Sequence, residues 1–173
     1  MTYIIIVFLL VVLFVILAMR QPDNFRVARS ETIDASAAEI FPFVNDQRKG
    51  QEWSPWFKLD PAAKITFNGP SSGIGAVSAW EGKKIGSGIS TITESQPNEL
   101  VKMRLEFLKP FKATNTAEFT LQPAGTGTSV SWIMYGHNNF MAKVMSLFMN
   151  CEKMVGPQFA QGLLNLKALV EKK

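Results

Sequence analysis

The 173-residue sequence has little of what most catalytic and metal sites are built from. It contains one cysteine, Cys151, and one histidine, His137. A single cysteine cannot form an intrachain disulfide, which excludes a disulfide-stabilised fold and agrees with a reducing compartment. One histidine and one cysteine cannot supply a zinc ligand set, so we expect no metal site. No N-x-S/T glycosylation sequence is present either.

Signatures of nucleotide and nucleic-acid binding are also missing. The net charge is only +4, and no basic cluster is interleaved with aromatic residues, so we expect no nucleic-acid partner. The basic pairs are scattered: Arg48 with Lys49, Lys83 with Lys84, and Lys172 with Lys173. We interpret them as solvated surface, while contact with anionic lipid would need them on one face. The glycine-rich residues 69–75 lack the spacing and the lysine of a phosphate-binding loop, and they indicate a hairpin connection.

One long hydrophobic run is present. Residues 3–19 (YIIIVFLLVVLFVILAM) are all apolar, and every charged side chain follows them. As a helix this run would measure roughly 25 Å, close to the thickness of a bilayer core. We predict a transmembrane anchor at residues 1–20, a polar linker at 21–24 and a water-soluble domain at 25–173. A cleaved signal peptide is the alternative, although no Lys or Arg precedes the run and no small-x-small cleavage pattern follows it.

The charges that flank the run predict its orientation. Arg20, Arg26 and Arg29 follow it closely, whereas the other side carries only the α-amino group. By the positive-inside rule, the C-terminal domain should lie in the cytoplasm. The sequence therefore predicts a single-pass protein of the cell membrane.

The rest of the chain alternates in a way that indicates an α+β domain. We expect a strand at 25–33, two short helices before residue 57, six strands between residues 64 and 135, and a helix from Asn139 to the end. The fourth of these six strands is the clearest, with Val101, Met103 and Phe107 alternating with charged residues. Gly156 and Pro157 should kink or break the helix. A bent antiparallel sheet wrapped around this helix would bury both apolar surfaces.

Several motifs in this order resemble the SRPBCC superfamily, also called START-like or Bet v 1-like. They are IDASAAEIF at 33–41, WSPW at 53–56, GPSSGIGA at 69–76, WEG at 80–82, ITES at 92–95, FTL at 119–121 and VSW at 130–132. The sequence is most similar to the polyketide cyclase/dehydrase-type branch. The resemblance implies a helix-grip fold, in which a seven-stranded sheet and the C-terminal helix enclose a deep apolar cavity. Members bind lipids, sterols, polyketides, quinones or plant hormones, and a minority catalyse cyclisation or dehydration. The family supplies no universal catalytic residue.

Aromatic and methionine side chains are the candidates for lining such a cavity. Methionine is flexible and polarizable, which suits an adaptable apolar site. Plain core packing is the alternative interpretation of the same residues. The predicted cavity residues are Trp53, Trp56, Trp80, Phe107, Phe119, Trp132, Met134, Met141, Met145 and Met149.

Few residues are candidates for catalysis, and we assign none. His137 falls where the last strand gives way to the helix, and Cys151 lies on the most apolar stripe of that helix, so we interpret them as a rim residue and a packing thiol. Glu106 and Glu118 fall opposite the apolar faces of their strands and should face solvent. Glu152 borders the methionine stripe, where it could line the cavity with a raised pKa or form a salt bridge at the rim.

Three hypotheses about function remain open at this point. The favoured one is a membrane-tethered domain that binds a hydrophobic small molecule, such as a lipid, a quinone or a polyketide-like compound, without a cofactor. An enzyme of the cyclase/dehydrase type would need at least two titratable groups converging inside the cavity. A protein-interaction module would have a filled core and an exposed apolar patch on the outside.

Overall fold

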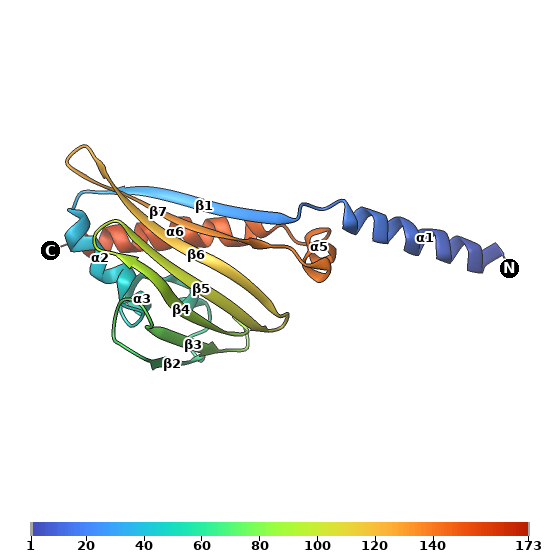
Figure 1. Cartoon of the computed structure of the whole chain (residues 1–173), viewed down its shortest axis with the longest axis horizontal. Coiled ribbons are helices and arrows are strands. Elements are labelled where there is room, and N and C mark those ends of the chain that lie inside the picture. The colour runs from blue at the N-terminus through green and yellow to red at the C-terminus, as the bar shows by residue number, and fades with distance from the viewer. Residues whose placement is uncertain (1, 173) are drawn as a thin grey trace.

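The computed structural model describes residues 2–172 as a curved antiparallel sheet that grips a long C-terminal helix, with one N-terminal helix standing apart (Figure 1). The elements are α1 Thr2–Met19, β1 Asn24–Ile33, α2 Ala37–Asn45, α3 Gly50–Trp53, α4 Pro55–Leu59, β2 Lys64–Asn68, β3 Val77–Glu81, β4 Ser87–Gln96, β5 Leu100–Lys109, β6 Ala113–Ala124, β7 Gly127–His137, α5 Phe140–Ser146 and α6 Cys151–Val170. The predicted α+β helix-grip architecture is confirmed.

The seven strands form one sheet in the order β1-β7-β6-β5-β4-β3-β2, and every neighbouring pair is antiparallel. Asn24 at the start of β1 pairs with His137 at the end of β7, and Ser87 at the start of β4 pairs with Lys109 at the end of β5. The β3–β4 and β5–β6 turns therefore lie at the same end of the sheet as α1 and α5 (Figure 1). We call this the anchor end of the domain.

The core lies between the inner face of the sheet and α6. Over the middle of β5 to β7, buried residues alternate with less buried ones, as the alternation predicted, and the buried members include Val101, Phe119, Leu121 and Val130. From α6, Phe159, Leu163, Leu166 and Val170 point into the same cluster. Burying four such side chains contributes on the order of 6–12 kcal/mol before the cost of ordering the chain, so α6 is a principal stabilising element.

Ion pairs attach α6 to β1 along its length. Arg29 pairs with Glu152 at 2.6 Å near the start of the helix, and Lys167 pairs with Glu31 at 2.8 Å near its end. Gly156 lets the Arg29 side chain pass close over the helix, because a Cβ there would lie 2.2 Å from Arg29 Nη2. Arg29 and Glu31 interrupt the apolar alternation of β1, and their ion pairs hold α6 against this strand.

The C-terminal helical region differs from the prediction in one respect. The helix is interrupted at residues 147–150, and α6 runs unbroken through Gly156 and Pro157. Asn150 accepts a hydrogen bond from the Lys153 backbone N–H and begins α6, just as Asn139 caps α5. The apolar arc over residues 140–155 is wide enough to fit one continuous helix, so it concealed this break.

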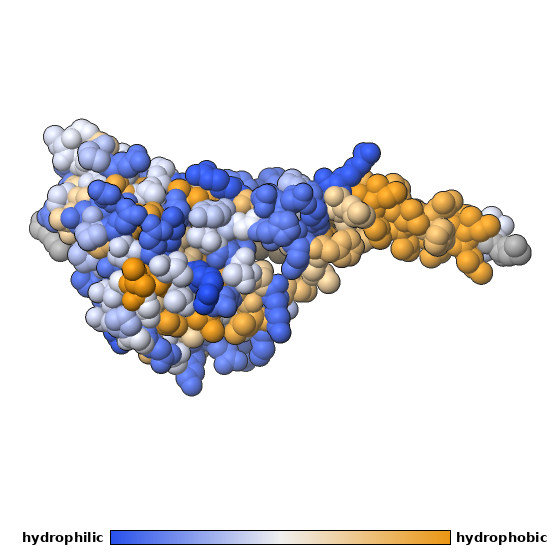
Figure 2. Space-filling view, viewed as in Figure 1, coloured by the Kyte–Doolittle hydropathy of each residue, from blue (hydrophilic) through white to orange (hydrophobic). Residues whose placement is uncertain are grey.

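Helix α1 extends away from the domain beyond the anchor end (Figure 1), and its apolar surface is bare over most of its length (Figure 2). Ala18 is the single buried residue among those described in this helix. Within residues 2–172, α1 is the one helix long and apolar enough to cross a membrane. A bare helix of this composition is stable only in an apolar environment or against a partner.

Candidate functional site

A cavity of about 570 Å³ lies between the inner face of the sheet, α3, α4 and α6. Its volume falls within the range of small-molecule sites, and its lining is mostly apolar. Seven of the ten predicted cavity residues line it: Trp53, Trp56, Trp80, Phe107, Phe119, Trp132 and Met134. They reach it from two short helices and four strands, so the sheet curvature brings together residues that are far apart in the sequence.

Packed aromatic rings make up one wall of the cavity. Trp132 stacks on Phe159 with ring centroids 4.0 Å apart and planes 8° from parallel, and Trp53 meets Trp132 edge-on at 5.3 Å. The Phe119 ring lies 5.0 Å from that of Trp132, tilted by 32°. The Trp53 indole N–H donates to the Phe43 carbonyl oxygen at 3.1 Å, which fixes that ring without an unpaired polar group. This wall is rigid, because each ring is held by at least one other.

The three remaining methionines of the predicted set lie elsewhere. Met141 and Met145 belong to α5, and Met149 lies in the turn that follows it, at the anchor end of the domain. None of them lines the cavity, whereas Met103 of β5 does. The break at residues 147–150 accounts for this, since it turns α5 away from the axis of α6.

A polar group within the cavity wall was not predicted. Gln47 Nε2 donates to Ser90 Oγ at 3.0 Å, and Ser78 Oγ donates to Gln47 Oε1 at 3.2 Å. Both serines are buried, and all three residues line the cavity. The sequence carried one signal for this cluster, because Ser78 shares a strand face with Trp80. Gln47 lies in the turn between α2 and α3, where no periodicity applies.

Two titratable side chains, Asp46 and Lys84, are among the cavity-lining residues. Asp46 Oδ1 accepts a hydrogen bond from the Arg48 backbone N–H at 2.8 Å, and Lys84 is exposed at the rim. Within the described part of the chain, no ion pair joins the two. The aromatic wall itself carries no acid or base.

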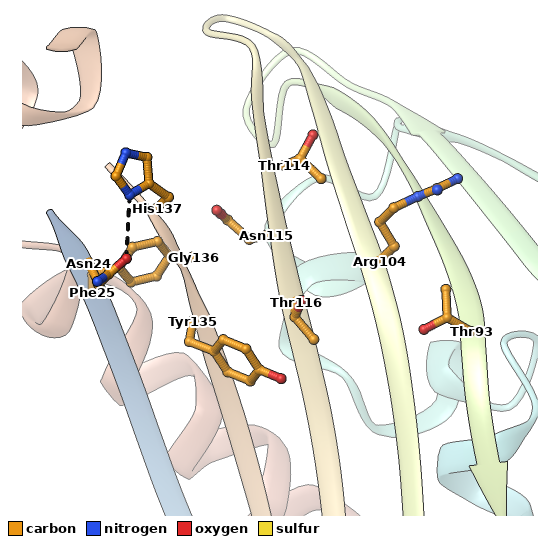
Figure 3. Close-up of a pocket in the computed structure, with 10 residues that line it drawn as sticks. All are labelled: Asn24, Phe25, Thr93, Arg104, Thr114, Asn115, Thr116, Tyr135, Gly136 and His137. Carbon is orange, nitrogen blue, oxygen red and sulfur yellow. Dashed lines mark hydrogen bonds between the residues drawn. The ribbon is translucent and has the colours of Figure 1, made fainter. Parts of the chain in front are cut away.

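The other catalytic candidates lie outside this cavity. His137 lines a shallow hollow on the outer face of the sheet, where its Nδ1 lies 3.4 Å from Asn24 Oδ1 (Figure 3). Tyr135 and Arg104 border the same hollow (Figure 3). Glu152 is occupied by its ion pair with Arg29, which is the salt-bridge alternative for this residue. Burial raises the pKa of the Cys151 thiol, and the neighbouring Glu152 charge raises it further.

Comparison with protein families identifies the domain. A family model described as polyketide cyclase/dehydrase and lipid transport matches residues 24–171, which is most of the chain. The chain belongs to this family. The SRPBCC resemblance seen in the sequence is therefore confirmed, and the polyketide cyclase/dehydrase and lipid transport family has the Bet v 1-like fold that the structure displays.

Solved structures agree on the fold of this family member. Protein MLL2253 from Mesorhizobium loti superposes with a TM-score of 0.64 at 14% identity, covering 86% of this chain and 98% of that one. Ara h 8.0201 gives 0.61 at 15% identity, covering 87% and 99%. DynU16, a putative protein of the dynemicin biosynthetic locus, gives 0.59 at 13% identity, covering 87% of this chain and 48% of that one. Sequence identities this low show that these proteins share the fold, and they carry no information about a shared function. A search of curated proteins finds no match.

Proposed function

We propose that this protein is a membrane-anchored binding protein for a hydrophobic small molecule that carries one polar group. The observation that supports it is the cavity of about 570 Å³, which is walled by aromatic rings and holds one hydrogen-bonded polar cluster. In this proposal residues 1–20 anchor the chain in the membrane, residues 21–24 link the anchor to the domain, and residues 25–173 form the domain that binds the ligand. The seven predicted aromatic and methionine residues that line the cavity would contact the apolar part of the ligand.

The polar cluster defines the class of ligand further. Ser90 Oγ accepts from Gln47 and keeps its own proton to donate, while Ser78 Oγ keeps lone pairs to accept. A single hydroxyl or carbonyl group could bond here while the remainder of the molecule stays among the rings. A lipid, a quinone or a polyketide-like compound has this character, and the family description names both polyketide chemistry and lipid transport.

The proposed anchor would keep the binding domain at the membrane surface. A tethered domain samples a membrane-dissolved ligand at a raised effective concentration. Arg20 and Arg26 are exposed shortly after the end of α1, and the positive-inside rule supports the proposal that the domain lies in the cytoplasm. A reporter fused after Lys173 that is active only outside the cytoplasm should therefore stay inactive.

An enzyme of the cyclase/dehydrase type is the second candidate, favoured only by the family description and by the presence of Asp46 at the cavity. Acid–base catalysis needs groups within hydrogen-bond reach of the reacting atoms. The Asp46 carboxylate accepts a hydrogen bond from the Arg48 backbone N–H within a turn, and Lys84 lies at the rim of the cavity. The binding function accounts for the cavity without requiring either of them to react.

Native mass spectrometry of the full chain, released from membranes in detergent, tests the proposal. The unsubstituted protein should carry a bound small molecule. Ala117 is buried on the inner face of β6 and lines the cavity, so Ala117→Phe should fill part of the volume and abolish the adduct. Thr116 directly precedes Ala117 and faces outward, so Thr116→Phe should retain the adduct.

Two results would contradict the binding proposal. One is a protein without adduct that also shows no thermal shift with a panel of lipids and quinones. The other is an adduct that Ala117→Phe and Thr116→Phe retain equally while both variants keep the native circular dichroism spectrum. In the second case the ligand would lie outside the cavity.

A further inference from the structure

Exposed apolar side chains gather in one stretch of the domain, across α5, the following turn and the first turn of α6. Phe148 is 74% exposed, and four others are exposed to a lesser degree. We call the five residues the apolar pad: Phe140, Met141, Phe148, Met149 and Met154. They make up half of the large exposed apolar side chains that lie outside α1 in the described residues, so their clustering needs a physical account.

The apolar pad adjoins α1. The rings of Phe14 and Phe148 lie 6.2 Å apart, and Ala18 of α1 is buried at this junction. Apolar colour continues from α1 onto the domain at the base of the helix (Figure 2). The pad is thus continuous with the surface proposed to lie in the membrane.

Polar contacts fix α5 to the linker beside that junction. Lys143 forms an ion pair with Asp23, and the Asn138 side chain donates to the Pro22 carbonyl oxygen at 3.0 Å. Ser146 Oγ donates to Gln21 Oε1 at 3.4 Å. Because these contacts hold α5 against the end of the anchor, the pad cannot move away from it without breaking them.

The depth of the pad follows from the geometry of the anchor. Phe14 precedes Met19 by five residues, which is roughly 7 Å along a helix axis. The Phe148 ring centroid lies 6.2 Å from that of Phe14. Along the axis of α1, the Phe148 ring therefore cannot lie much closer to the domain than Met19 does. If α1 crosses the membrane, the Phe148 ring reaches the boundary between headgroups and acyl chains.

We propose that the apolar pad lies in the surface of the bilayer that α1 crosses, making α5 and the turn after it a second membrane-binding element. This inference rests on the proposed membrane anchor and specifies what the domain does beside it. The 18 residues of α1 span about 27 Å, slightly less than a 30 Å hydrocarbon core, so a flanking apolar surface makes up the difference. Two exposed cations suited to lipid headgroups are close by in the chain: Arg20 directly follows α1, and Lys153 directly precedes Met154 of the pad.

Depth-dependent quenching in the full chain tests the inference. A Cys151→Ser background removes the native thiol, and single cysteines at Phe148, Leu10 or Thr126 carry an environment-sensitive fluorophore. The proteins are reconstituted into phosphatidylcholine–phosphatidylglycerol vesicles with or without a lipid nitroxide at acyl carbon 5. Leu10 lies mid-anchor, and Thr126 is exposed in the β6–β7 turn, at the other end of the sheet.

Labels at Phe148→Cys and Leu10→Cys should both be quenched, and the label at Thr126→Cys should not be. Quenching at position 10 without quenching at position 148 would overturn the pad and leave the anchor standing. Absence of quenching at position 10 would overturn the anchor, and with it the membrane part of the proposed function. The two failures are therefore distinguishable.

A second arm guards against the label itself partitioning into lipid. With the label at Met141→Cys, the additional changes Phe148→Ser and Met149→Ser should lower quenching by about twofold or more, because the pad loses much of its apolar area. Leu164→Ser, an equally exposed site on α6, should leave quenching unchanged. Unchanged quenching in the Phe148/Met149 variant would overturn the proposal.

Discussion

At the scale of single residues, Cys151 illustrates how surroundings control reactivity. It is the first residue of α6, and it is partly buried against the core. Burial raises the pKa of its thiol, and the adjacent Glu152 carboxylate raises it further because negative charge disfavours the thiolate. Only the thiolate is an effective nucleophile, so the thiol is suited to packing and not to catalysis.

Alkylation of the full chain by iodoacetamide should therefore be slow at pH 8 and should accelerate as the pH rises. Glu152→Gln removes the negative charge and leaves the Arg29 guanidinium nearby, so the pKa of the thiol should fall. The rate at pH 8 should rise by roughly threefold or more, because it follows the thiolate fraction. Mass spectrometry of the alkylated protein measures this rate.

The matched control is Glu31→Gln, which breaks the other ion pair between β1 and α6 and lies far along the helix from Cys151. Its alkylation rate should equal that of the unsubstituted protein. If both variants are alkylated faster than the unsubstituted protein by the same factor, then loosening of α6, and not the charge of Glu152, controls the reactivity of the thiol.

How far residues could be assigned from sequence depended on the element that carries them. On the strands, period-two alternation correctly placed Phe107, Phe119, Trp132 and Met134 on the inner face, because a regular strand leaves only two directions for a side chain. Gln47 lies in an irregular turn, where sequence does not determine direction. Its contacts with the serines arise from tertiary structure, and ligand binding by any of these residues stays a prediction.

At the scale of elements, α6 approaches its neighbours through two glycines with different surroundings. A Cβ at Gly162 would lie 2.6 Å from Trp132 Cζ3 and 3.1 Å from Pro55 Cδ. The Trp132 ring cannot shift readily, because it stacks on Phe159 and meets Trp53. A Cβ at Gly156 would meet the flexible ends of two side chains, the Arg29 guanidinium at 2.2 Å and Glu152 Oε1 at 3.3 Å.

Alanine at these two positions should therefore affect stability differently. Alanine gains about 1 kcal/mol over glycine in a helix, while overpacking a core costs about 1–3 kcal/mol. Gly162→Ala should lower the free energy of unfolding by about 1–2 kcal/mol, because its gain in propensity is outweighed. Urea unfolding of the full chain in detergent, followed by tryptophan fluorescence, measures the change.

Gly156→Ala provides the comparison within the same helix. The free energy of unfolding of Gly156→Ala should stay within about 1 kcal/mol of that of the unsubstituted protein. The substitution disturbs a partly exposed ion pair but raises helix propensity, and the two effects offset each other. Equal destabilisation by both substitutions would mean that α6 packs as tightly on β1 as on the aromatic wall.

Element boundaries were predictable where strong local signals exist. Ser36 and Glu39 have the spacing of a capping box, and Glu39 accepts a hydrogen bond from the Ser36 backbone N–H at 3.0 Å at the start of α2. The break at residues 147–150 has no glycine or proline, and the Asn150 cap is its only local sign. α5 contacts α1 and the linker, and a periodicity argument does not include such tertiary contacts.

At the scale of the whole molecule, the antiparallel order brings functional features to one end. The anchor, α5, and the turns that carry Lys84, Ile85 and Phe111 all belong to the anchor end. Ile85 lines the cavity, as does Val155, which follows Met154 of the apolar pad. The cavity is thus built next to the surface proposed to meet the bilayer, as a protein that takes its ligand from a membrane would require.

A chain beginning at Gln21 should reveal the same surface in the absence of a membrane. Removing α1 uncovers the Phe148 ring that Phe14 contacts, and the apolar pad is then bare in water. This chain should fold, because α1 contacts the domain mainly through α5, and it should self-associate. Sedimentation velocity over a range of concentrations measures the association.

Phe148→Ser with Met149→Ser should weaken that association by about tenfold or more, because burial of each exposed side chain contributes on the order of 1 kcal/mol. Leu164→Ser, outside the pad, should leave it unchanged. A monomeric chain from Gln21 onward at all concentrations would show that the pad is too small to drive burial on its own. Association that persisted in the doubly substituted chain would instead assign the contact to Leu108 and Phe111, which are exposed beside the β5–β6 turn at the same end.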